Sequence, residues 1–239
     1  MNVLDLFSGI GGFSLGLERA GMKTVAFCEV DKKCQQVLKK HWPGVPIFDD
    51  VSTLKGEYIE ETVDVICGGF PCQDISLAGK GAGLEGKRSG LWSEFKRLIE
   101  EIKPKYAIIE NVSALRSRGL DQVLREISEI GYDAEWHCIT AASVGAPHRR
   151  DRVWIISYPK GERVQGLWTS GQQESHTHEE ETVFMRYRKR FRKAYWEDEP
   201  SVARVVDGFS RRVDRVKQLG NAVVPQIPEL IGRAICQAG

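Results

Sequence analysis

The chain has 239 residues, 41% of them hydrophobic and 28% charged, with a formal net charge of +1 at pH 7. That length and composition suit one main α/β domain with a small appendage. Because the net charge is close to zero, the protein as a whole does not attract a polyanion, so any basic surface must be local. No apolar segment approaches the length of a membrane span, and no signal peptide opens the chain. The six cysteines have neither C-x-x-C nor zinc-ligand spacing. We therefore expect free thiols, no metal site and a soluble, cytoplasmic protein without membrane contact.

The first predicted elements are a strand over residues 2–7, a glycine-rich turn at residues 8–12 and a helix over residues 13–20. A strand, a glycine turn and a helix in this order are typical of the start of a nucleotide-binding βαβ unit. The turn lacks the full G-x-G-x-x-G pattern and the Lys-Ser/Thr pair of a phosphate-binding loop, so NTP hydrolysis is not expected. A simple tight turn between strand and helix is the alternative interpretation.

An acidic residue closes the second predicted strand. Residues 23–30 form this strand, Glu29 lies at its end, and a helix is predicted to begin at Asp31. An acidic residue in this place is typical of a group that holds the ribose hydroxyls of an adenosine. The alternative is a helix cap, although Asp31 can fill that role instead.

A second acidic site follows residues 46–48. Asp50 is a candidate acceptor for an adenine amino group, and the side chain of Val51 could pack on the ring. The alternative for Asp50 is a solvated loop carboxylate without a ligand.

The apolar run at residues 63–67 reads as a buried parallel strand, and two glycines end it. Pro71 then fixes the backbone and sets Cys72 at the carboxyl end of this strand, the edge where open parallel α/β sheets bind ligands. The chain from there to Leu91 is polar and rich in glycine, which indicates a mobile lid beside the thiol. A buried structural cysteine before a surface loop is the alternative.

A glutamate follows the next predicted strand. After an amphipathic helix over residues 91–102, residues 106–109 form a buried strand that ends in Glu110. A carboxylate directly after four apolar residues is costly unless it has a partner, which indicates a functional site. The alternative is a cap for the following helix. A helix over residues 119–130 and a strand over residues 132–140 come next.

Three arginines enter the last predicted strand, residues 153–157, in the run His148-Arg149-Arg150-Asp151-Arg152. Arg150 and Arg152 are two positions apart, so we predict that they share one face of a strand. A solvated charged turn is the alternative.

The regular pattern is lost between residues 158 and 200, which predicts a small insert. Within it, residues 184–193 contain six basic residues, three aromatic residues and no acid. Basic residues interleaved with aromatic rings are typical of contacts to a nucleic-acid backbone. The alternative is an amphipathic helix with a solvated face. A structured turn at residues 220–225 and a helix over residues 227–238 close the chain.

The order and spacing of these segments resemble the DNA cytosine-5 methyltransferase family over residues 1–157 and 200–239. The similar segments are, in order, Asp5-Leu6-Phe7-Ser8-Gly9-x-Gly11-Gly12-Phe13 for the first cofactor motif, Gly69-Phe70-Pro71-Cys72-Gln73 for the nucleophile motif, Glu110-Asn111-Val112 for the glutamate motif, His148-x-Arg150-x-Arg152 for the Gln-x-Arg-x-Arg motif and Gly220-Asn221-Ala222-Val223 for the last motif. The Pro-Cys-Gln and Glu-Asn-Val segments in this order are the most specific part of the resemblance.

The resemblance implies the α/β fold of class I S-adenosylmethionine-dependent methyltransferases, Rossmann-like, with a mostly parallel sheet, helices on both faces and a small insert. Residues 1–157 and 201–239 would form the catalytic domain, with the terminal helix packing near the first strand. Residues 158–200 would form a target-recognition insert that is short for the family.

The resemblance also assigns site residues. Catalysis would depend on Cys72, Glu110, Arg150 and Arg152. The cofactor S-adenosylmethionine, with S-adenosylhomocysteine as product, would be bound by Asp5, Phe7, Ser8, Gly9, Gly11, Gly12, Phe13, Glu29, Val30, Asp50, Val51, Pro71, Leu91, Asn221 and Ala222. DNA would be contacted by Gln73, Lys80, Lys87, Arg88, Arg186, Arg188, Lys189 and Arg190. His148 replaces the usual glutamine of the arginine motif. Val30 stands where some members carry tryptophan, so weaker stacking on adenine is expected.

The implied activity is methyl transfer to C5 of a flipped-out cytosine in duplex DNA, through a covalent bond between Cys72 and C6. Glu110 would hold or protonate N3, and Arg152 with Arg150 would bind O2 and brace the other groups. A tRNA cytosine-5 methyltransferase and a catalytically weak or partner-dependent DNA-binding homologue stay open as alternatives. We expect a bacterial or phage-encoded monomer that acts at the nucleoid, and a cognate restriction endonuclease is a further partner to consider.

Overall fold

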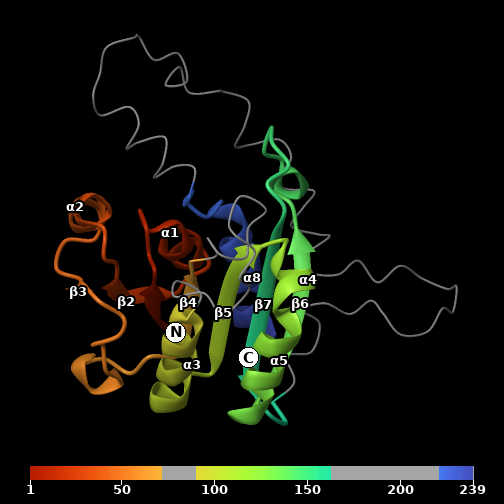
Figure 1. The fold of residues 1–239 in the computed structure, drawn as a ribbon. Coiled ribbons are helices and arrows are strands. Elements are labelled where there is room, and N and C mark those ends of the chain that lie inside the picture. Colours follow the sequence, from red (N-terminus) through yellow and green to blue (C-terminus); the bar gives the residue numbers. More distant parts are fainter. Residues whose placement is uncertain (72–89, 163–220, 239) are drawn as a thin grey trace, which may run out of the picture.

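The computed structural model describes residues 1–71, 90–162 and 221–238, which form a sheet with helices on both faces (Figure 1). Within these residues seven strands make one sheet in the order β3-β2-β1-β4-β5-β7-β6. The strands are β1 (Asn2–Leu6), β2 (Lys23–Cys28), β3 (Ile47–Phe48), β4 (Val65–Gly69), β5 (Tyr106–Val112), β6 (Tyr132–Ile139) and β7 (Arg152–Pro159). The helices are α1 (Gly12–Arg19), α2 (Lys32–His41), α3 (Leu91–Ile102), α4 (Leu115–Arg118), α5 (Leu120–Glu129) and α8 (Gln226–Ala238), with short 3-10 turns η1 (Gly56–Tyr58) and η3 (Ala141–Val144).

The strands from β3 to β5 all pair in parallel, whereas β7 runs antiparallel to both of its neighbours, β5 and β6. The predicted mostly parallel α/β sheet is therefore confirmed. One shared direction brings the carboxyl ends of β1, β2, β4 and β5 to the same edge of the sheet. That edge is where parallel α/β sheets bind ligands.

Each face of the sheet has its own apolar cluster. In β1, Leu4 and Leu6 belong to the cluster beneath α3 and α5, whereas Val3 belongs to the cluster beneath α1 and α8. This alternation follows from the opposite directions of successive side chains along a strand. Burying one large apolar side chain contributes about 1.5–3 kcal/mol, so both clusters hold the helices firmly on the sheet.

Two strands differ from their predicted bounds in ways that shape the site. β5 continues to Val112, so Glu110 lies within the strand rather than after its end. β7 continues to Pro159, so the sheet extends two residues into the stretch predicted as an insert. Residues 163–200, which are most of that stretch, lie outside the described residues, as do residues 201–220.

The predicted common strand face for the two arginines is wrong. β7 begins at Arg152, and Arg150 lies before it with a φ of 39°. A left-handed backbone is uncommon for a residue with a Cβ atom, and here it turns the chain just before the strand begins. The alternating geometry of a strand therefore does not apply to this pair.

Helix α8 packs against α1, and its apolar residues share a cluster with Val3 of β1 (Figure 1). Gly16 lies at the contact between the two helices. A Cβ atom at this position would collide with the carbonyl oxygen of Pro225 and lie 2.9 Å from the amide nitrogen of Glu229. Both are backbone atoms, which cannot move aside as the end of a flexible side chain can.

No described helix is long and apolar enough to cross a membrane. Within the same residues, no group of three or more His, Cys, Asp or Glu side chains could hold a metal ion.

We predict that Gly16→Ala lowers the free energy of unfolding by about 1–3 kcal/mol, because the added methyl group has to push α8 away from α1. In an open helix the same change would be stabilising by up to about 1 kcal/mol. Urea unfolding of the variant, with Glu100→Ala on the exposed side of α3 as control, measures the effect. A Gly16→Ala protein as stable as the original would contradict this account of the helix contact.

Candidate active site

Glu110 is paired with an arginine at the carboxyl edge of the sheet. Its Oε1 accepts from Nε of Arg152 at 2.8 Å, and the two side chains are 14% and 22% exposed. The pair bridges the seam where β5 and β7 run in opposite directions, with Val112 opposite Arg152 in the register. Because β5 continues past Glu110, the carboxylate on β5 and the guanidinium group on β7 meet across two neighbouring strands.

The environment of Glu110 changes its acidity. Burial raises the pKa of its carboxyl group, and the positive charges of Arg152 and Arg150 only partly oppose this effect. Desolvation penalises the charged form of the acid, so this carboxyl holds a proton at higher pH than an exposed glutamate does. A carboxyl group with a raised pKa suits a role in which it takes up and gives back a proton.

The backbone before the predicted nucleophile lies directly beside this carboxyl. Gly69 is the register partner of Glu110 in the parallel pairing of β4 and β5. A Cβ atom on Gly69 would come 2.6 Å from Oε2 of Glu110, so the glycine makes room for the carboxylate. The side-chain amide of Asn111, a buried residue, donates from Nδ2 to the carbonyl oxygen of Phe70 at 3.2 Å. These contacts hold the chain that leads to Cys72 against the end of β5.

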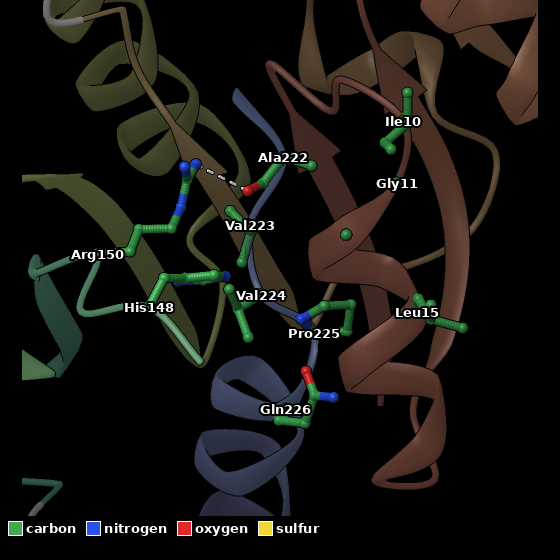
Figure 2. Close-up of a pocket in the computed structure, with 11 residues that line it drawn as sticks. Ile10, Gly11, Leu15, His148, Arg150, Ala222, Val223, Val224, Pro225 and Gln226 are labelled. Atoms are coloured by element: carbon green, nitrogen blue, oxygen red, sulfur yellow. Dashed lines mark hydrogen bonds between the residues drawn. The ribbon is translucent and has the colours of Figure 1, made fainter. Parts of the chain in front are cut away.

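Arg150 reaches the same region from another direction. Its Nη2 donates to the carbonyl oxygen of Ala222 at 2.9 Å, as the dashed line in Figure 2 shows. The residue therefore links the segment before β7 to the turn before α8. Its positive charge, together with that of Arg152, partly opposes the rise that burial causes in the pKa of Glu110.

A pocket of about 300 Å³ lies between the start of α1 and the segment before β7, and the turn before α8 lines it as well (Figure 2). It combines three of the family-like motifs, because its lining residues are Ile10, Gly11, Gly12, Leu15, His148, Arg150, Ala222, Val223, Val224, Pro225 and Gln226. The pocket is thus continuous from the glycine turn to one of the two arginines near Glu110.

Glu29 lies at the end of β2 and is nearly buried. Its Oε2 accepts from the amide of Gly9 at 2.6 Å and its Oε1 from the amide of Asp31 at 2.8 Å. Asp31 caps α2, since its side chain accepts from the amides of Lys33 and Cys34. Glu29 is therefore not the helix cap, and it joins the glycine turn to the end of β2.

An exposed apolar residue and an exposed carboxylate stand near Glu29. Val30 lies two residues after the end of β2 and is 76% exposed, so a large apolar side chain faces solvent there. Asp50 is also exposed, and hydrogen bonds from the hydroxyl and the amide of Ser52 lower the pKa of its carboxyl. The side chain of Val51 points into the core and is only 6% exposed. An apolar surface flanked by two acids fits an adenosine, whose ring is flat and whose ribose and amino groups donate hydrogen bonds.

The glycine turn is built from left-handed residues. Phe7, Gly9 and Gly11 have φ angles of 54°, 55° and 86°. Gly11 needs to be glycine for a second reason, because a Cβ atom there would lie 2.6 Å from the ring of Trp42. The buried hydroxyl of Ser8 donates to the carbonyl oxygen of Asp5 at 2.6 Å and closes the turn. Because the turn is compact, its backbone can approach a ligand closely.

Gly12 brings this turn against the segment before α8. A Cβ atom on Gly12 would come 2.6 Å from the carbonyl oxygen of Val223. Nearby, Asn221 is exposed and Ala222 is partly buried. The glycine turn and the last motif are thus neighbours in space.

Asp5 and Phe13 lie beneath this surface. Asp5 is completely buried, and its Oδ2 accepts from the hydroxyl of Ser14 at 2.7 Å and from its amide at 3.3 Å. Burial is the main cause that raises the pKa of Asp5 to about 7, although the bonds from Ser14 oppose it. Phe13 is 3% exposed and packs on the ring of Trp154, with centroids 5.4 Å apart.

Several predicted site residues cannot be placed. Pro71 and Leu91 are partly buried; Pro71 directly precedes the undescribed residues 72–89, and Leu91 begins α3 two residues after them. Those outside the described residues are the nucleophile Cys72 and the predicted DNA contacts Gln73, Lys80, Lys87, Arg88, Arg186, Arg188, Lys189 and Arg190.

A family model described as "C-5 cytosine-specific DNA methylase" matches residues 1–205. The chain belongs to this family. Among its curated relatives, Type II methyltransferase M2.BsuMI of Bacillus subtilis is 39% identical over 165 residues, which are 66% of this chain and 42% of the relative. Type II methyltransferase M.CviJI of Paramecium bursaria Chlorella virus IL3A is 38% identical over 159 residues, or 66% of this chain and 43% of the relative.

The chain therefore spans about two fifths of the length of these two relatives. Another member, M.AquIA of Picosynechococcus, is 32% identical over 183 residues and is matched over 74% of its own length.

Solved structures share the fold. A chain described as a DNA modification methyltransferase encoded within a prophage of E. coli is 31% identical, with a TM-score of 0.57 over 67% of this chain and 47% of that chain. A mutant of Spodoptera frugiperda DNMT2 has a TM-score of 0.58 at 19% identity, over 73% of this chain and 53% of that one, a likeness that shows the fold alone.

Some residues that position the methylase motifs are not evident from the sequence. For Asn111 the sequence gives a weak indication. A side-chain amide directly after a glutamate in a strand must find a hydrogen-bond partner if it is buried. Arg97 lies three and four residues from Glu94 and Glu101, a spacing that predicts only ordinary helix ion pairs. Its further contacts to a distant loop cannot be read from spacing.

We predict that the stabilising contribution of Asp5 falls as pH rises. Its folded pKa of about 7 lies above the ordinary 3.8, so between these values the folded state binds more protons than the unfolded state and stability declines with pH. At about 1.4 kcal/mol per pKa unit the loss amounts to a few kcal/mol. Asp5→Asn removes this titration. Its stability relative to the original protein should therefore improve between pH 4 and pH 8, in a window set by the two pKa values.

Urea unfolding at several pH values measures this difference, with Asp133→Asn at an exposed position of β6 as control. A difference between Asp5→Asn and the original protein that does not vary with pH would mean that Asp5 keeps its charge in the folded state.

Proposed function

We propose that this chain transfers a methyl group from S-adenosylmethionine to C5 of a cytosine flipped out of duplex DNA. The observation that carries the proposal is the partly buried ion pair of Glu110 and Arg152 beside the backbone of Gly69, three residues before Cys72. Membership of the DNA methylase family supports the reaction class, and the similar Type II methyltransferases support DNA as the substrate.

The thiol of Cys72 would start the reaction. Cytosine C5 is a poor nucleophile, and it becomes enamine-like when a thiolate adds to C6. In this step the sulfur forms a bond to C6, and the electron pair of the C5=C6 bond moves to C5. A free thiol has a pKa of about 8.5 and is little ionised at neutral pH. The positive charges of Arg150 and Arg152 would favour the thiolate.

Glu110 would neutralise the negative charge that this addition pushes into the ring, by giving a proton to N3. Its raised pKa lets the carboxyl carry a proton that it can share with or give to N3 as negative charge develops. When the reaction closes, C5 loses its proton to solvent, the bond between sulfur and C6 breaks, and N3 returns its proton to Glu110. Neither Glu110 nor Cys72 is consumed.

The two arginines would have different tasks. Arg152 is held by Glu110 and would bind O2 of the base while it braces the acid. Arg150 is anchored to the carbonyl oxygen of Ala222, so it would add positive charge from the side of the last motif.

The carboxyl edge of the sheet offers a fitting site for S-adenosylmethionine. When bound, this cofactor supplies an electrophilic methyl group on a sulfonium sulfur. Glu29 would hold the ribose, Asp50 the amino group of adenine, and Val30 would offer its exposed side chain to the ring. The remaining candidates around this site are Phe7, Ser8, Gly9, Gly11, Gly12, Val51, Pro71, Leu91, Asn221 and Ala222. Asp5 and Phe13 are buried and would act by shaping the turn above them.

The DNA contacts belong to the same proposal. Extracting the base costs a few kcal/mol of lost stacking and pairing, which contacts to flanking phosphates have to offset. The candidate contacts are Gln73, Lys80, Lys87, Arg88, Arg186, Arg188, Lys189 and Arg190.

Similarity to Type II methyltransferases also supports a cognate restriction endonuclease as a partner in the same system. We further propose that the protein is a monomer and acts at the nucleoid.

We predict that Glu110→Gln slows methyl transfer to duplex DNA by about 10²–10⁴-fold, because an amide of the same shape cannot exchange the proton.

Cys72→Ser should abolish transfer while binding of S-adenosylhomocysteine persists. Incorporation of labelled methyl groups measures the rates, and Glu129→Gln at an exposed site of α5 is the control.

Near-normal turnover by Glu110→Gln would remove its proposed role. Equal loss of cofactor binding and transfer in Cys72→Ser would make Cys72 structural. A parallel incubation with tRNA separates the substrates, since methylation of tRNA without methylation of DNA would replace the proposed substrate.

A further inference from the structure

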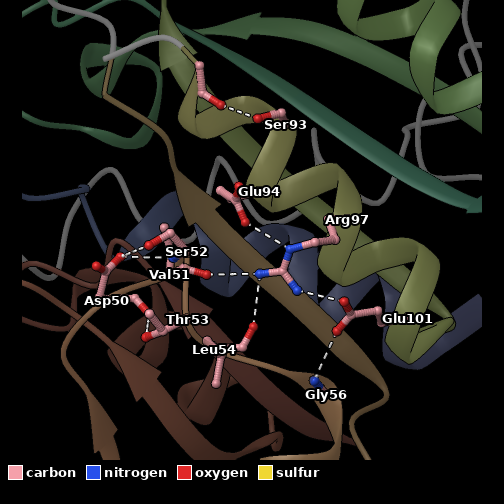
Figure 3. A network of polar contacts seen from close by, with 11 residues as sticks. Asp50, Val51, Ser52, Thr53, Leu54, Gly56, Ser93, Glu94, Arg97 and Glu101 are labelled. Carbon is pink, nitrogen blue, oxygen red and sulfur yellow. Dashed lines mark hydrogen bonds and ion pairs between the residues drawn. The ribbon is translucent and has the colours of Figure 1, made fainter. Parts of the chain in front are cut away.

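Arg97 lies on α3 and clamps a loop far away in the sequence (Figure 3). Its Nη2 donates to the carbonyl oxygen of Val51 at 3.0 Å and to that of Leu54 at 2.9 Å. The same side chain pairs with Glu94 at 2.8 Å and with Glu101 at 2.7 Å. The guanidinium group thus uses three nitrogens at once, and two of its four partners are backbone atoms of one loop.

A second contact supports the same loop. Oε2 of Glu101 accepts from the amide of Gly56 at 3.2 Å, so the loop is bound to α3 beyond Leu54 as well. Val51 and Leu54 are buried, with 6% and 1% exposure, and both belong to the cluster beneath α3. Apolar packing holds the loop on the helix, and the arginine fixes its backbone orientation.

This loop carries Asp50. The carboxylate of Asp50 is exposed and is bonded within its own turn to Ser52, while the hydroxyl of Thr53 donates to the carbonyl oxygen of Asp50 at 3.1 Å. Its local turn fixes the rotation of the carboxylate but not the place of the turn relative to the sheet. Before Asp50, the pairing of β3 with β2 holds the chain. After it, the bonds from Arg97 to the carbonyl oxygens of Val51 and Leu54 fix the backbone of the turn on α3 (Figure 3).

Helix α3 also begins with Leu91, the residue that the family resemblance puts beside the cofactor. One helix therefore carries at its first residue a side chain proposed to lie beside the cofactor, and about two turns later the arginine that binds the Asp50 loop.

We propose that Arg97 is a positioning residue that sets the affinity for the adenine end of S-adenosylmethionine. Arg97 touches neither the reacting atoms nor the base. It holds the carbonyl oxygens of Val51 and Leu54, and through them the place of the Asp50 carboxylate. This inference deepens the proposed function and rests on it.

The test uses the full chain without DNA and S-adenosylhomocysteine as the probe, with binding measured by isothermal titration calorimetry. Arg97→Met keeps the length of the side chain and removes every hydrogen bond. It should raise the dissociation constant by about tenfold, the equivalent of losing one hydrogen bond to a charged donor. Arg97→Lys retains a charge and part of the bonding, so it should fall between Arg97→Met and the original protein.

Glu94→Gln is the matched control. It weakens the ion pair within α3 but leaves both bonds from Arg97 to the loop in place. Its dissociation constant should stay within about twofold of the original, a change below the worth of one ordinary hydrogen bond. In methyl-transfer assays, Arg97→Met should raise KM for S-adenosylmethionine, with kcat at saturating cofactor and KM for DNA nearly unchanged.

A folded Arg97→Met protein that binds S-adenosylhomocysteine as tightly as the original would overturn the inference. Equal weakening by Arg97→Met and Glu94→Gln would also overturn it, because the effect would then belong to helix stability. Should Arg97→Met fail to fold, the order of Arg97→Lys and Glu94→Gln decides in the same way.

The outcomes separate this inference from the proposed function. A protein that binds the probe through Arg97 but methylates no DNA would contradict the function alone, and one that methylates DNA without dependence on Arg97 would contradict the inference alone. Absence of probe binding by the original protein would contradict both.

Discussion

The site depends on Glu110, whose carboxylate is largely buried next to the antiparallel strand β7. Taking the charged carboxylate of Glu110 out of water costs several kcal/mol, so it is stable there only when a positively charged group lies close to it. Arg152 provides that partner because β7 runs antiparallel to β5 and begins at the edge where β5 ends. On the other side β4 offers Gly69, whose missing side chain leaves room for the same carboxylate. A parallel strand in the place of β7 would start at the opposite edge and could not bring an arginine there from its first residue.

The proposed cofactor side of the molecule follows a different physical rule. Its acids are held by backbone amides and hydroxyl groups, as Glu29 is by Gly9 and Asp31. Such bonds fix a carboxylate without cancelling its charge, which suits the recognition of ribose hydroxyls and of a sulfonium ion. The two sides meet at the turn before α8, where the carbonyl oxygen of Val223 lies against Gly12 and that of Ala222 accepts from Arg150. A change in that turn would therefore be felt on both sides.

Local patterns predict the strands, the glycine turns and the general place of the motifs, because apolar periodicity and glycine reflect local physics. The reach of β5 to Val112 could not be predicted in this way. It is set by pairing with β7, a partner far away in the sequence. The left-handed backbone of Arg150 is likewise imposed by its surroundings, and strand geometry misplaces it. Asp5 illustrates a third limit. Its motif indicates a cofactor contact, but only the packed structure reveals that it is completely buried and bonded to Ser14. The role of Arg97 depends on backbone carbonyl oxygens, and because every residue has one, the sequence does not indicate which of them an arginine will bind.

The central claim is that Glu110 and the two arginines activate a cytosine for attack by Cys72. Trapping with duplex DNA that contains 5-fluorocytosine tests it most directly, because fluorine at C5 cannot leave as a proton does and the covalent adduct persists. In the presence of S-adenosylmethionine the account predicts one denaturation-resistant adduct per chain, with mass spectrometry of the digested complex placing the bond on the peptide that contains Cys72. The absence of an adduct, or an adduct on the exposed Cys138 instead, would contradict it.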